Sequence, residues 1–196
     1  MACSSIITCI DLEVLMMKVL ILTGSPHPQG TTALLADEFI VGAKEAGHEV
    51  VRYDTAKLDI HPCLGCYHCR NNDGQCVYDD DMKQIVPHLL AADAVVLVTP
   101  LYYFGMTAQL KRVIDRYFSV NPILRKTPKQ LCLLAACGDK EGWAMDTLVL
   151  HYRTLCRYLQ WQEGGMVLAI GSYTRKDVED SNYPVMARNL GTGLRA

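Results

Sequence analysis

The sequence predicts an α/β protein built on a doubly wound, five-stranded parallel sheet with the strand order 2-1-3-4-5. Short apolar runs rich in β-branched residues alternate with segments of helical periodicity along the 196 residues. Most of these runs are apolar throughout, which is typical of strands buried on both faces. Hydrophobic residues make up 50% of the chain, enough for one sizeable core. We therefore expect a single domain over residues 17–196, preceded by a weakly structured extension over residues 1–16.

The predicted elements follow one another in a regular strand–helix alternation. We expect strands over residues 19–23, 48–53, 94–99, 131–136 and 166–170. We expect helices over residues 31–46, 79–90, 108–118 and 142–159, and a short one near 184–190 in a polar tail. The run Asp79–Asp81 should supply caps and first-turn carboxylates. Pro87 should kink its helix or delay the start of that helix.

Charge and cysteine content exclude several function classes. The net charge of −2 gives no electrostatic case for nucleic acid or an anionic membrane. No apolar run approaches the ~20 residues that a membrane helix needs. The cysteine count of 9 is odd, and residues 1–15 carry no Lys or Arg of a secretory signal. We therefore expect a reducing, cytoplasmic setting.

The segment Gly24–Thr32 joins the first predicted strand to the first predicted helix, and it suits a phosphate. A helix N-terminus offers unpaired N–H groups and the positive end of the helix dipole. Ser25, Thr31 and Thr32 add hydroxyl groups. The segment lacks G-x-G-x-x-G and G-K-[ST], which disfavours a dinucleotide or a triphosphate. We predict a monophosphate held at Ser25, Gly30, Thr31 and Thr32; the alternative is an ordinary turn whose threonines cap the helix.

A run of aromatic residues follows the third predicted strand. Tyr102, Tyr103 and Phe104 come in succession after Pro100 and Leu101, and such a run suits stacking on a planar ring better than a solvated turn. Gly105 then permits close approach of the backbone. Packing at a subunit contact is the alternative. Cys137 and Gly138 follow the fourth predicted strand and should cover the other side of the same crevice.

A cluster of cysteines forms the most unusual motif of the chain. Cys63, Cys66, Cys69 and Cys76 have the spacing C-x2-C-x2-C-x6-C. Three interpretations stay open: the thiolates hold a [4Fe–4S] cluster, they hold zinc, or they are unligated thiols. Two of the other cysteines, Cys132 and Cys156, are expected in the core.

The remaining ionisable residues give weaker indications. A basic run, Lys111, Arg112 and Arg116, is expected on a solvated helix face, with contact to a nucleotide phosphate as the alternative. The single histidines, His68, His88 and His151, have no catalytic partners nearby in sequence and should be surface or packing residues.

These motifs, taken in order, resemble those of the NADPH-dependent FMN reductase superfamily, and within it most of all the iron–sulfur flavoproteins. The resemblance extends from about residue 17 to 170. It is carried by these motifs: Gly24-Ser25-Pro26, Thr32, Cys63–Cys76 followed by Asp79-Asp80-Asp81-Met82, Thr99–Gly105, and Thr107–Lys111.

The resemblance implies a flavodoxin-like fold, bound FMN, and a homodimer or a dimer of dimers whose site is completed across the subunit contact. The cofactor would carry the chemistry itself, so no catalytic side chain is expected. The implied FMN-binding residues are Ser25, His27, Gly30, Thr31, Thr32, Pro100, Leu101, Tyr102, Tyr103, Phe104, Gly105, Cys137 and Gly138.

Two departures from the family pattern stand out. His27 occupies a position where the family loop usually has Arg or Lys, and Gly30-Thr31 stands where Ser-Asn is usual. An imidazole is a weaker, pH-dependent cation, which predicts weaker binding of the phosphate. The gap before Cys76 is also one residue longer than in the compact cluster-binding spacing.

Two functions are therefore expected as alternatives. In the first, the protein is an oxidoreductase that passes electrons from NADPH or NADH through FMN to a small acceptor, such as a quinone, flavin, nitro or azo compound. In the second, it is an electron carrier in which a [4Fe–4S] cluster takes single electrons from ferredoxin and relays them to FMN.

Overall fold

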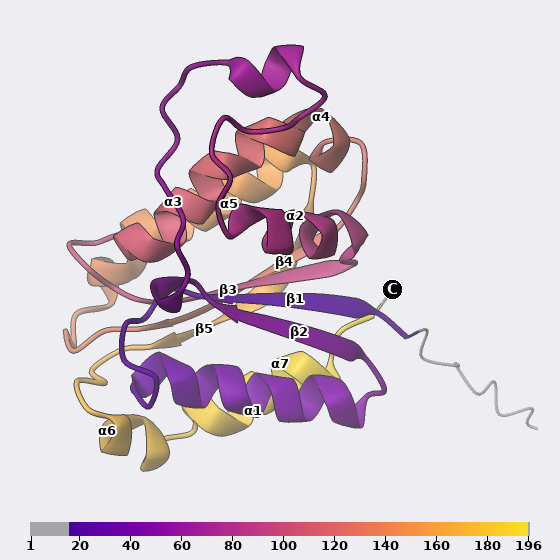
Figure 1. Cartoon of the computed structure of the whole chain (residues 1–196). Helices are drawn as coiled ribbons and strands as arrows, with labels where there is room; N and C mark the ends of the chain where they lie inside the picture. Colours follow the sequence, from indigo (N-terminus) through magenta and orange to yellow (C-terminus); the bar gives the residue numbers. More distant parts are fainter. Residues whose placement is uncertain (1–15, 196) are drawn as a thin grey trace, which may run out of the picture.

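The computed structural model describes residues 16–195, so of the predicted extension over residues 1–16 only Met16 lies within the described part. A five-stranded parallel sheet with the order β2-β1-β3-β4-β5 forms the centre of the protein, as predicted (Figure 1). Its strands are β1 (Lys18–Thr23), β2 (Glu49–Asp54), β3 (Ala94–Pro100), β4 (Gln130–Ala136) and β5 (Gln162–Ala169).

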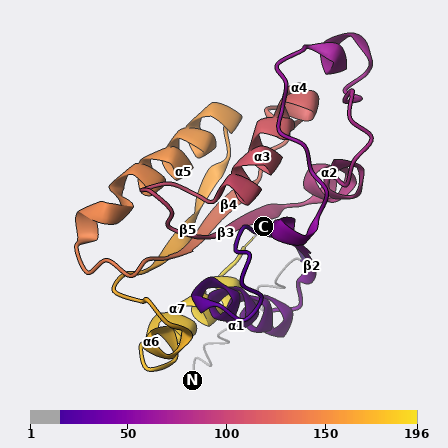
Figure 2. The same cartoon turned by 60° about the vertical axis from the view of Figure 1, so that its left-hand side comes forward.

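Helices cover both faces of the sheet (Figures 1 and 2). One face carries α1 (Thr31–Glu45), α6 (Arg175–Glu179) and α7 (Tyr183–Thr192). The other face carries α2 (Met82–Ala91), α3 (Ala108–Arg116), the short α4 (Asn121–Leu124) and α5 (Asp146–Leu159). Each face has its own cluster of buried apolar side chains, with Val95 and Leu97 of β3 on one side and Val96 and Val98 on the other. This is the doubly wound arrangement expected from the apolar strands β1, β3 and β4, which are buried on both faces.

The register of the sheet brings the carboxyl ends of the strands to one edge. Thr23 of β1 pairs with Asp54 of β2 and with Val98 of β3. Ala136 of β4 pairs with Pro100 of β3 and with Ala169 of β5. The loops that follow these strands therefore gather at the same edge, where ligands bind in open α/β sheets.

Several predicted boundaries need correction. Asp79–Asp81 does not enter the first turn of α2, which begins at Met82; instead, Asp80 Oδ1 accepts a hydrogen bond from the Met82 N–H at 3.1 Å. Pro87 lies inside α2 without delaying its start. Pro100 does not break β3 but forms its last residue.

Two predicted helices are each divided in the structure, and one strand is longer than predicted. The predicted helix 108–118 ends at Arg116 and continues as a 3-10 turn, Tyr117–Val120. The predicted helix 142–159 starts with a 3-10 turn, Gly142–Met145, before α5. Strand β5 begins at Gln162, four residues before the predicted start at 166.

The C-terminal part is more structured than predicted. The polar tail contains two helices, α6 and α7, and α7 packs against α1. The contact is a close backbone approach: a Cβ atom on Gly42 of α1 would lie 2.0 Å from the Arg188 carbonyl oxygen. The Thr192 hydroxyl donates to the Gly42 carbonyl at 3.3 Å. Helix α1 is thereby fixed by the end of the described chain.

In the described residues 16–195, every helix is too short or too polar to cross a membrane.

Candidate functional site

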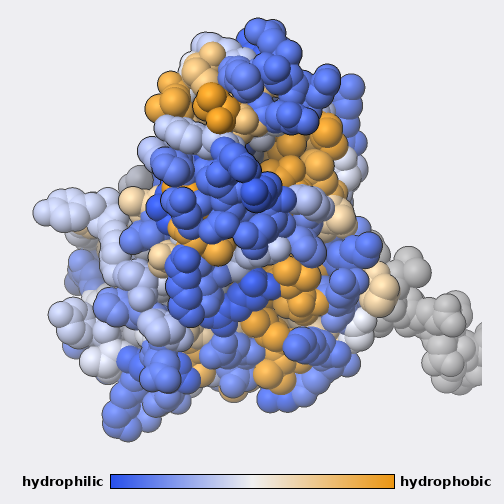
Figure 3. Space-filling model, viewed as in Figure 1, coloured by the Kyte–Doolittle hydropathy of each residue, from blue (hydrophilic) through white to orange (hydrophobic). Residues whose placement is uncertain are grey.

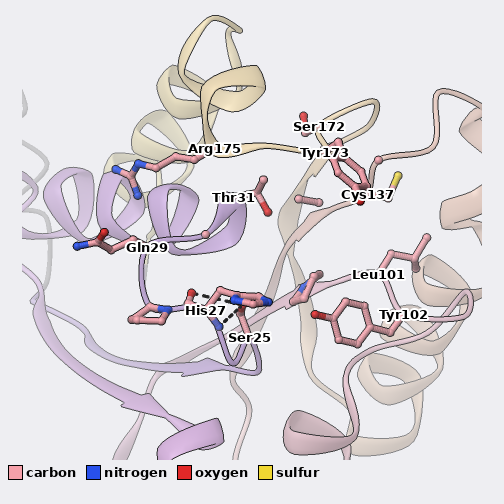
Figure 4. A pocket seen from close by; sticks show the side chains of 15 residues that line it. Ser25, His27, Gln29, Thr31, Leu101, Tyr102, Cys137, Ser172, Tyr173 and Arg175 are labelled. Carbon is pink, nitrogen blue, oxygen red and sulfur yellow. Dashed lines mark hydrogen bonds between the residues drawn. The ribbon is translucent and has the colours of Figure 1, made fainter.

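A cavity of about 730 Å³ lies at the carboxyl edge of the sheet, among the loops after β1, β3, β4 and β5 (Figure 4). Its lining residues are Ser25, His27, Pro28, Gln29, Gly30, Thr31, Pro100, Leu101, Tyr102, Ala136, Cys137, Gly138, Ser172, Tyr173 and Arg175. Figure 4 shows that the cavity has two ends: Gln29 and Arg175 lie at one, and Leu101, Tyr102 and Cys137 lie at the other. A ligand with a polar end and a planar apolar end matches this division.

The loop between β1 and α1 presents backbone donors to the polar end. The Ser25 hydroxyl oxygen accepts from the His27 N–H at 3.1 Å, and the Gly30 N–H donates to the His27 carbonyl at 3.1 Å. These bonds fold the loop back on itself. Gly30 is the N-cap of α1 and has no side chain to cap the helix, so the first N–H groups of α1 are left for a ligand.

Gly24 fixes this loop against the next one. Its carbonyl accepts from the Thr107 hydroxyl at 2.9 Å, and its N–H donates to the Val98 carbonyl at 2.8 Å. A Cβ atom at position 24 would lie 2.3 Å from Thr107 Oγ1. Only glycine allows the loops after β1 and β3 to meet this closely.

The aromatic run forms a tight hairpin turn. Tyr102 and Gly105 exchange two backbone hydrogen bonds, of 3.0 and 3.2 Å. The two residues between them, Tyr103 and Phe104, have left-handed backbones with φ of 46° and 62°. Phe104 stacks on Trp143 at a ring-centroid distance of 5.4 Å, whereas Tyr103 is 101% exposed. Such strain in bulky residues is typical of functional loops.

The structure brings together nine of the thirteen residues predicted for the cofactor. Ser25, His27, Gly30, Thr31, Pro100, Leu101, Tyr102, Cys137 and Gly138 line the cavity. Tyr103 and Phe104 line an adjoining cavity of about 420 Å³ that shares Leu101, Cys137 and Gly138. Gly105 lines neither cavity, and Thr32 is buried behind the loop at 1% exposure.

Sequence reasoning missed six lining residues: Pro28, Gln29, Ala136, Ser172, Tyr173 and Arg175. Three of these, Ser172, Tyr173 and Arg175, follow β5. Their position after the carboxyl end of a predicted strand was the signal that could have found them.

Cys137 is the one thiol on the cavity wall, among the described residues. Its Sγ donates to the Asp139 carbonyl at 3.4 Å. Burial raises the pKa of Cys137 and outweighs the hydrogen bonds that lower it, so the side chain is a neutral thiol at pH 7. It therefore contributes shape and polarisability rather than charge.

The cysteine segment protrudes from the α2–α3 face and is visible at the top of Figures 1 and 3. Cys63 and Cys66 are exposed, and Cys69 and Cys76 are half-buried. Hydrophobic side chains are exposed on the same segment, including Leu64 and Val77. The segment is therefore weakly packed against the rest of the protein.

The two ends of this segment are tied together by a buried ion pair. Arg116 Nη1 donates to Asp80 Oδ2 at 2.7 Å and to the His61 carbonyl at 2.9 Å. Asp80 Oδ2 in turn accepts from the His61 N–H at 3.0 Å. Arg116 is only 3% exposed, so the prediction that Lys111, Arg112 and Arg116 share a solvated face is wrong for Arg116. Arg112 Nη2 also donates hydrogen bonds, to the carbonyl oxygens of Thr55 and Leu58 at 2.8 and 2.9 Å.

The four thiols are near enough to influence one another, yet they are not arranged as metal ligands. Burial raises the pKa of Cys69, and the negative charges of Cys76, Cys63 and Cys66 raise it further. Within residues 16–195, no three His, Cys, Asp or Glu side chains are gathered closely enough to hold a metal ion. The described loop conformation thus does not fit a bound cluster, although four thiolates suit a soft metal centre.

Comparison with known proteins adds independent information. Residues 17–174 match the family described as NADPH-dependent FMN reductase. Two iron–sulfur flavoproteins of Methanocaldococcus jannaschii are similar: one is 38% identical over 100 residues, covering 51% of each chain, and the other is 35% identical over 131 residues, covering 64% of each. The matched part of this chain thus spans between about half and two thirds of these relatives.

The fold also matches solved structures over almost the whole chain. The structure of an NAD(P)H:quinone oxidoreductase from Methanothermobacter marburgensis has a TM-score of 0.70 with 18% identity, covering 92% of this chain and 97% of that one. At this identity the likeness concerns the fold alone.

Proposed function

Because the chain belongs to the NADPH-dependent FMN reductase family, we propose that it is an FMN-dependent oxidoreductase. It would take electrons from NADPH or NADH and pass them to a small acceptor such as a quinone, a free flavin, or a nitro or azo compound.

The observation that carries this proposal is the two-ended cavity at the carboxyl edge of the sheet. Its polar end, with the N-terminus of α1 and the Ser25 and Thr31 hydroxyls, suits a phosphate. Its other end, with Leu101 and Tyr102, suits a flat ring. FMN is a ligand with these two ends, so the donor set fits the cofactor.

The residues of this chain would bind and orient the cofactor. When bound, FMN supplies the hydride-transfer chemistry. The loop from Ser25 to Thr31 would hold the phosphate, and Pro100, Leu101 and Tyr102 would support the ring. The adjoining cavity beside Tyr103 and Phe104 gives an electron donor or acceptor room to stack, because it opens next to the ring end.

The test of this function has two stages. Purified protein, stripped of flavin, should quench FMN fluorescence with a stoichiometry of about one. The reconstituted protein should then oxidise NADPH or NADH in the presence of a benzoquinone. Failure to bind FMN would exclude the proposal; binding without oxidation of either nucleotide would exclude the reductase and leave a carrier.

A second candidate function is electron relay through a [4Fe–4S] cluster held by Cys63, Cys66, Cys69 and Cys76. It is favoured by the names of the similar archaeal proteins and by the spacing of the four cysteines on one segment. The protruding loop would have to rearrange to gather these ligands. In that function, a reduced ferredoxin would be the electron donor in place of a nicotinamide.

Iron analysis distinguishes the two candidates. Protein prepared without oxygen should contain about four irons and four acid-labile sulfides per chain if the cluster forms, and Cys66→Ser should lose both while FMN is kept. Anaerobic protein with flavin but without iron would leave the reductase alone.

We also propose a homodimer or a dimer of dimers. The apolar side of α3 is not available for this contact, because it is buried within the chain itself, with Leu110 and Val113 at 0% exposure. Exposed aromatic residues remain at the site, namely Tyr102, Tyr103, Phe104, Trp143 and Tyr173. Light scattering at micromolar concentration tests the assembly.

A further inference from the structure

We propose that Arg175, the first residue of α6, supplies the positive charge that lets the cavity distinguish FMN from uncharged flavins. This inference rests on the proposed function, because it concerns the phosphate of the cofactor in the same cavity.

The first argument is the charge of the cavity wall. Among its fifteen lining residues, Arg175 is the one with a permanent charge, and none is a carboxylate. The phosphate loop from Ser25 to Thr31 contains no Lys or Arg. A phosphate monoester carries a charge of about −1.5 to −2 at pH 7. The N-terminus of α1 offsets only about half a charge, so a cation facing the cavity would strengthen phosphate binding.

The second argument is the position of the side chain. Figure 4 shows Arg175 reaching from the start of α6 to the end of the cavity where Gln29 lies, opposite Leu101 and Tyr102. A ring supported at Tyr102 would therefore place its phosphate toward Arg175.

The third argument is that the guanidinium keeps donors available. Arg175 Nε donates to Glu179 Oε1 at 2.8 Å, one turn along α6. This pair uses one edge of the guanidinium and orients it. The Nη groups make no hydrogen bond to the residues that the structure describes, and they form the planar fork that suits phosphate oxygens.

The other cations nearby are also paired with carboxylates, as Arg175 is with Glu179, but they lie in a different cavity. Arg52 and Lys57 lie with Thr32 in a small cavity behind the loop. Arg52 pairs with Asp37 at 2.7 Å and with Asp54 at 2.8 Å, and Lys57 pairs with Asp54 at 3.2 Å. Arg175 is thus the cation that faces the main cavity. The family match ends at residue 174, so the match does not extend to this position.

The experiment compares two flavins that differ only in the phosphate. Flavin-free protein is titrated with FMN and with riboflavin, and flavin fluorescence gives both dissociation constants. Arg175→Gln should weaken FMN binding by on the order of tenfold to a hundredfold and leave riboflavin binding unchanged. Arg175→Lys keeps the charge but not the planar fork, so its dissociation constant for FMN should lie between those of wild type and Arg175→Gln.

Lys176→Gln is the matched control. It removes the same charge from the adjacent residue, but Lys176 pairs with Asp180 at 3.0 Å and does not line the cavity. It should leave both affinities unchanged.

The outcomes separate this inference from the proposed function. Arg175→Gln with unchanged FMN affinity, or with equal losses for FMN and riboflavin, would overturn the role of Arg175 while the flavin site stands. A wild-type protein that binds neither flavin would overturn the proposed function itself.

Discussion

The carboxylate of Asp80 and the guanidinium of Arg116 form an ion pair with an Oδ2–Nη1 distance of 2.7 Å, and their side chains are only 1% and 3% exposed. They come from the end of the cysteine segment and from the last turn of α3. Because Asp80 and Arg116 also bind the backbone of His61, the pair closes the base of the segment 62–79.

Breaking this pair should destabilise the protein strongly. Arg116→Met leaves the Asp80 carboxylate buried without its partner and should lower the free energy of unfolding by about 3–5 kcal/mol. Urea denaturation measures the change. Lys83→Met is the control: it breaks the exposed Lys83–Asp79 pair of 2.8 Å and should cost under about 1 kcal/mol. Equal effects of the two variants would show that the burial of the pair is without consequence.

The same pair predicts how stability depends on pH. Desolvation raises the pKa of Asp80, but the hydrogen bonds from Arg116, His61 and Met82 outweigh it, so the pKa lies below its ordinary value. A carboxyl whose pKa is lowered by folding stabilises the protein above its unfolded pKa of about 3.9. The free energy of unfolding of wild type should thus exceed that of Asp80→Asn by a constant amount from pH 5 to 7. This difference should shrink below about pH 4, as the pH falls through the native pKa.

Urea unfolding at each pH measures this difference. Asp79→Asn, an exposed neighbour, should differ little from wild type throughout the range. If the stability difference between wild type and Asp80→Asn instead grew as the pH fell, the pKa of Asp80 would not be lowered by folding.

The aromatic hairpin should store measurable strain. A left-handed backbone costs a bulky residue roughly 1–2 kcal/mol, and asparagine tolerates it better. Tyr103 has φ of 46° and is fully exposed, so Tyr103→Asn removes strain without loss of packing. We expect the free energy of unfolding to rise by about 0.5–1 kcal/mol. Tyr102→Asn, at a neighbouring position outside the left-handed region, should give no such gain.

Removal of a hydroxyl from the phosphate loop should weaken FMN binding. Thr31→Val keeps the shape of the side chain but deletes a donor at the cavity wall, and it should cost about 1.5–3 kcal/mol of binding free energy. Thr32→Val changes a side chain that is 1% exposed and should have a smaller effect. Fluorescence titration with FMN compares them. A larger loss for Thr32→Val would place the phosphate nearer Thr32, which is one of the four residues predicted from the sequence to hold it.

The sheet was predictable because its signal is local and redundant. Short apolar runs alternate with helical segments, and this alternation recurs along the chain, although the run that forms β2 also contains Glu49 and Arg52. Most predicted boundaries lie within a few residues of the observed ones; for example, the helix predicted over residues 31–46 ends at Glu45, and Gly47, with φ of 84°, follows it. The helix predicted near residues 184–190 is α7, whereas α6 was missed because it is short and polar and gains its stability from packing on α1 rather than from periodicity.

The site was predictable only where it follows from strand ends and loop composition. The burial of Arg116 was not predicted because a basic run on a helix usually indicates a solvent-exposed face. Only the fold shows that Asp80 forms an ion pair with Arg116. Arg175 was missed for a related reason: it lies far along the chain from the phosphate loop, and only the parallel register brings β5 beside that edge. Contacts of this kind are set by topology, which residue types alone do not reveal.

The close contact between α1 and α7 has a consequence for how the protein folds. Thr192 and Gly42 are 150 residues apart in sequence, so this contact closes a long loop of chain and should form late in folding, after α1 has packed on the sheet. The first N–H groups of α1 belong to the phosphate loop, so the docking of α7 steadies the helix that carries this loop. Flavin should accordingly bind late in folding, and free flavin should speed the final docking step of refolding rather than the early collapse.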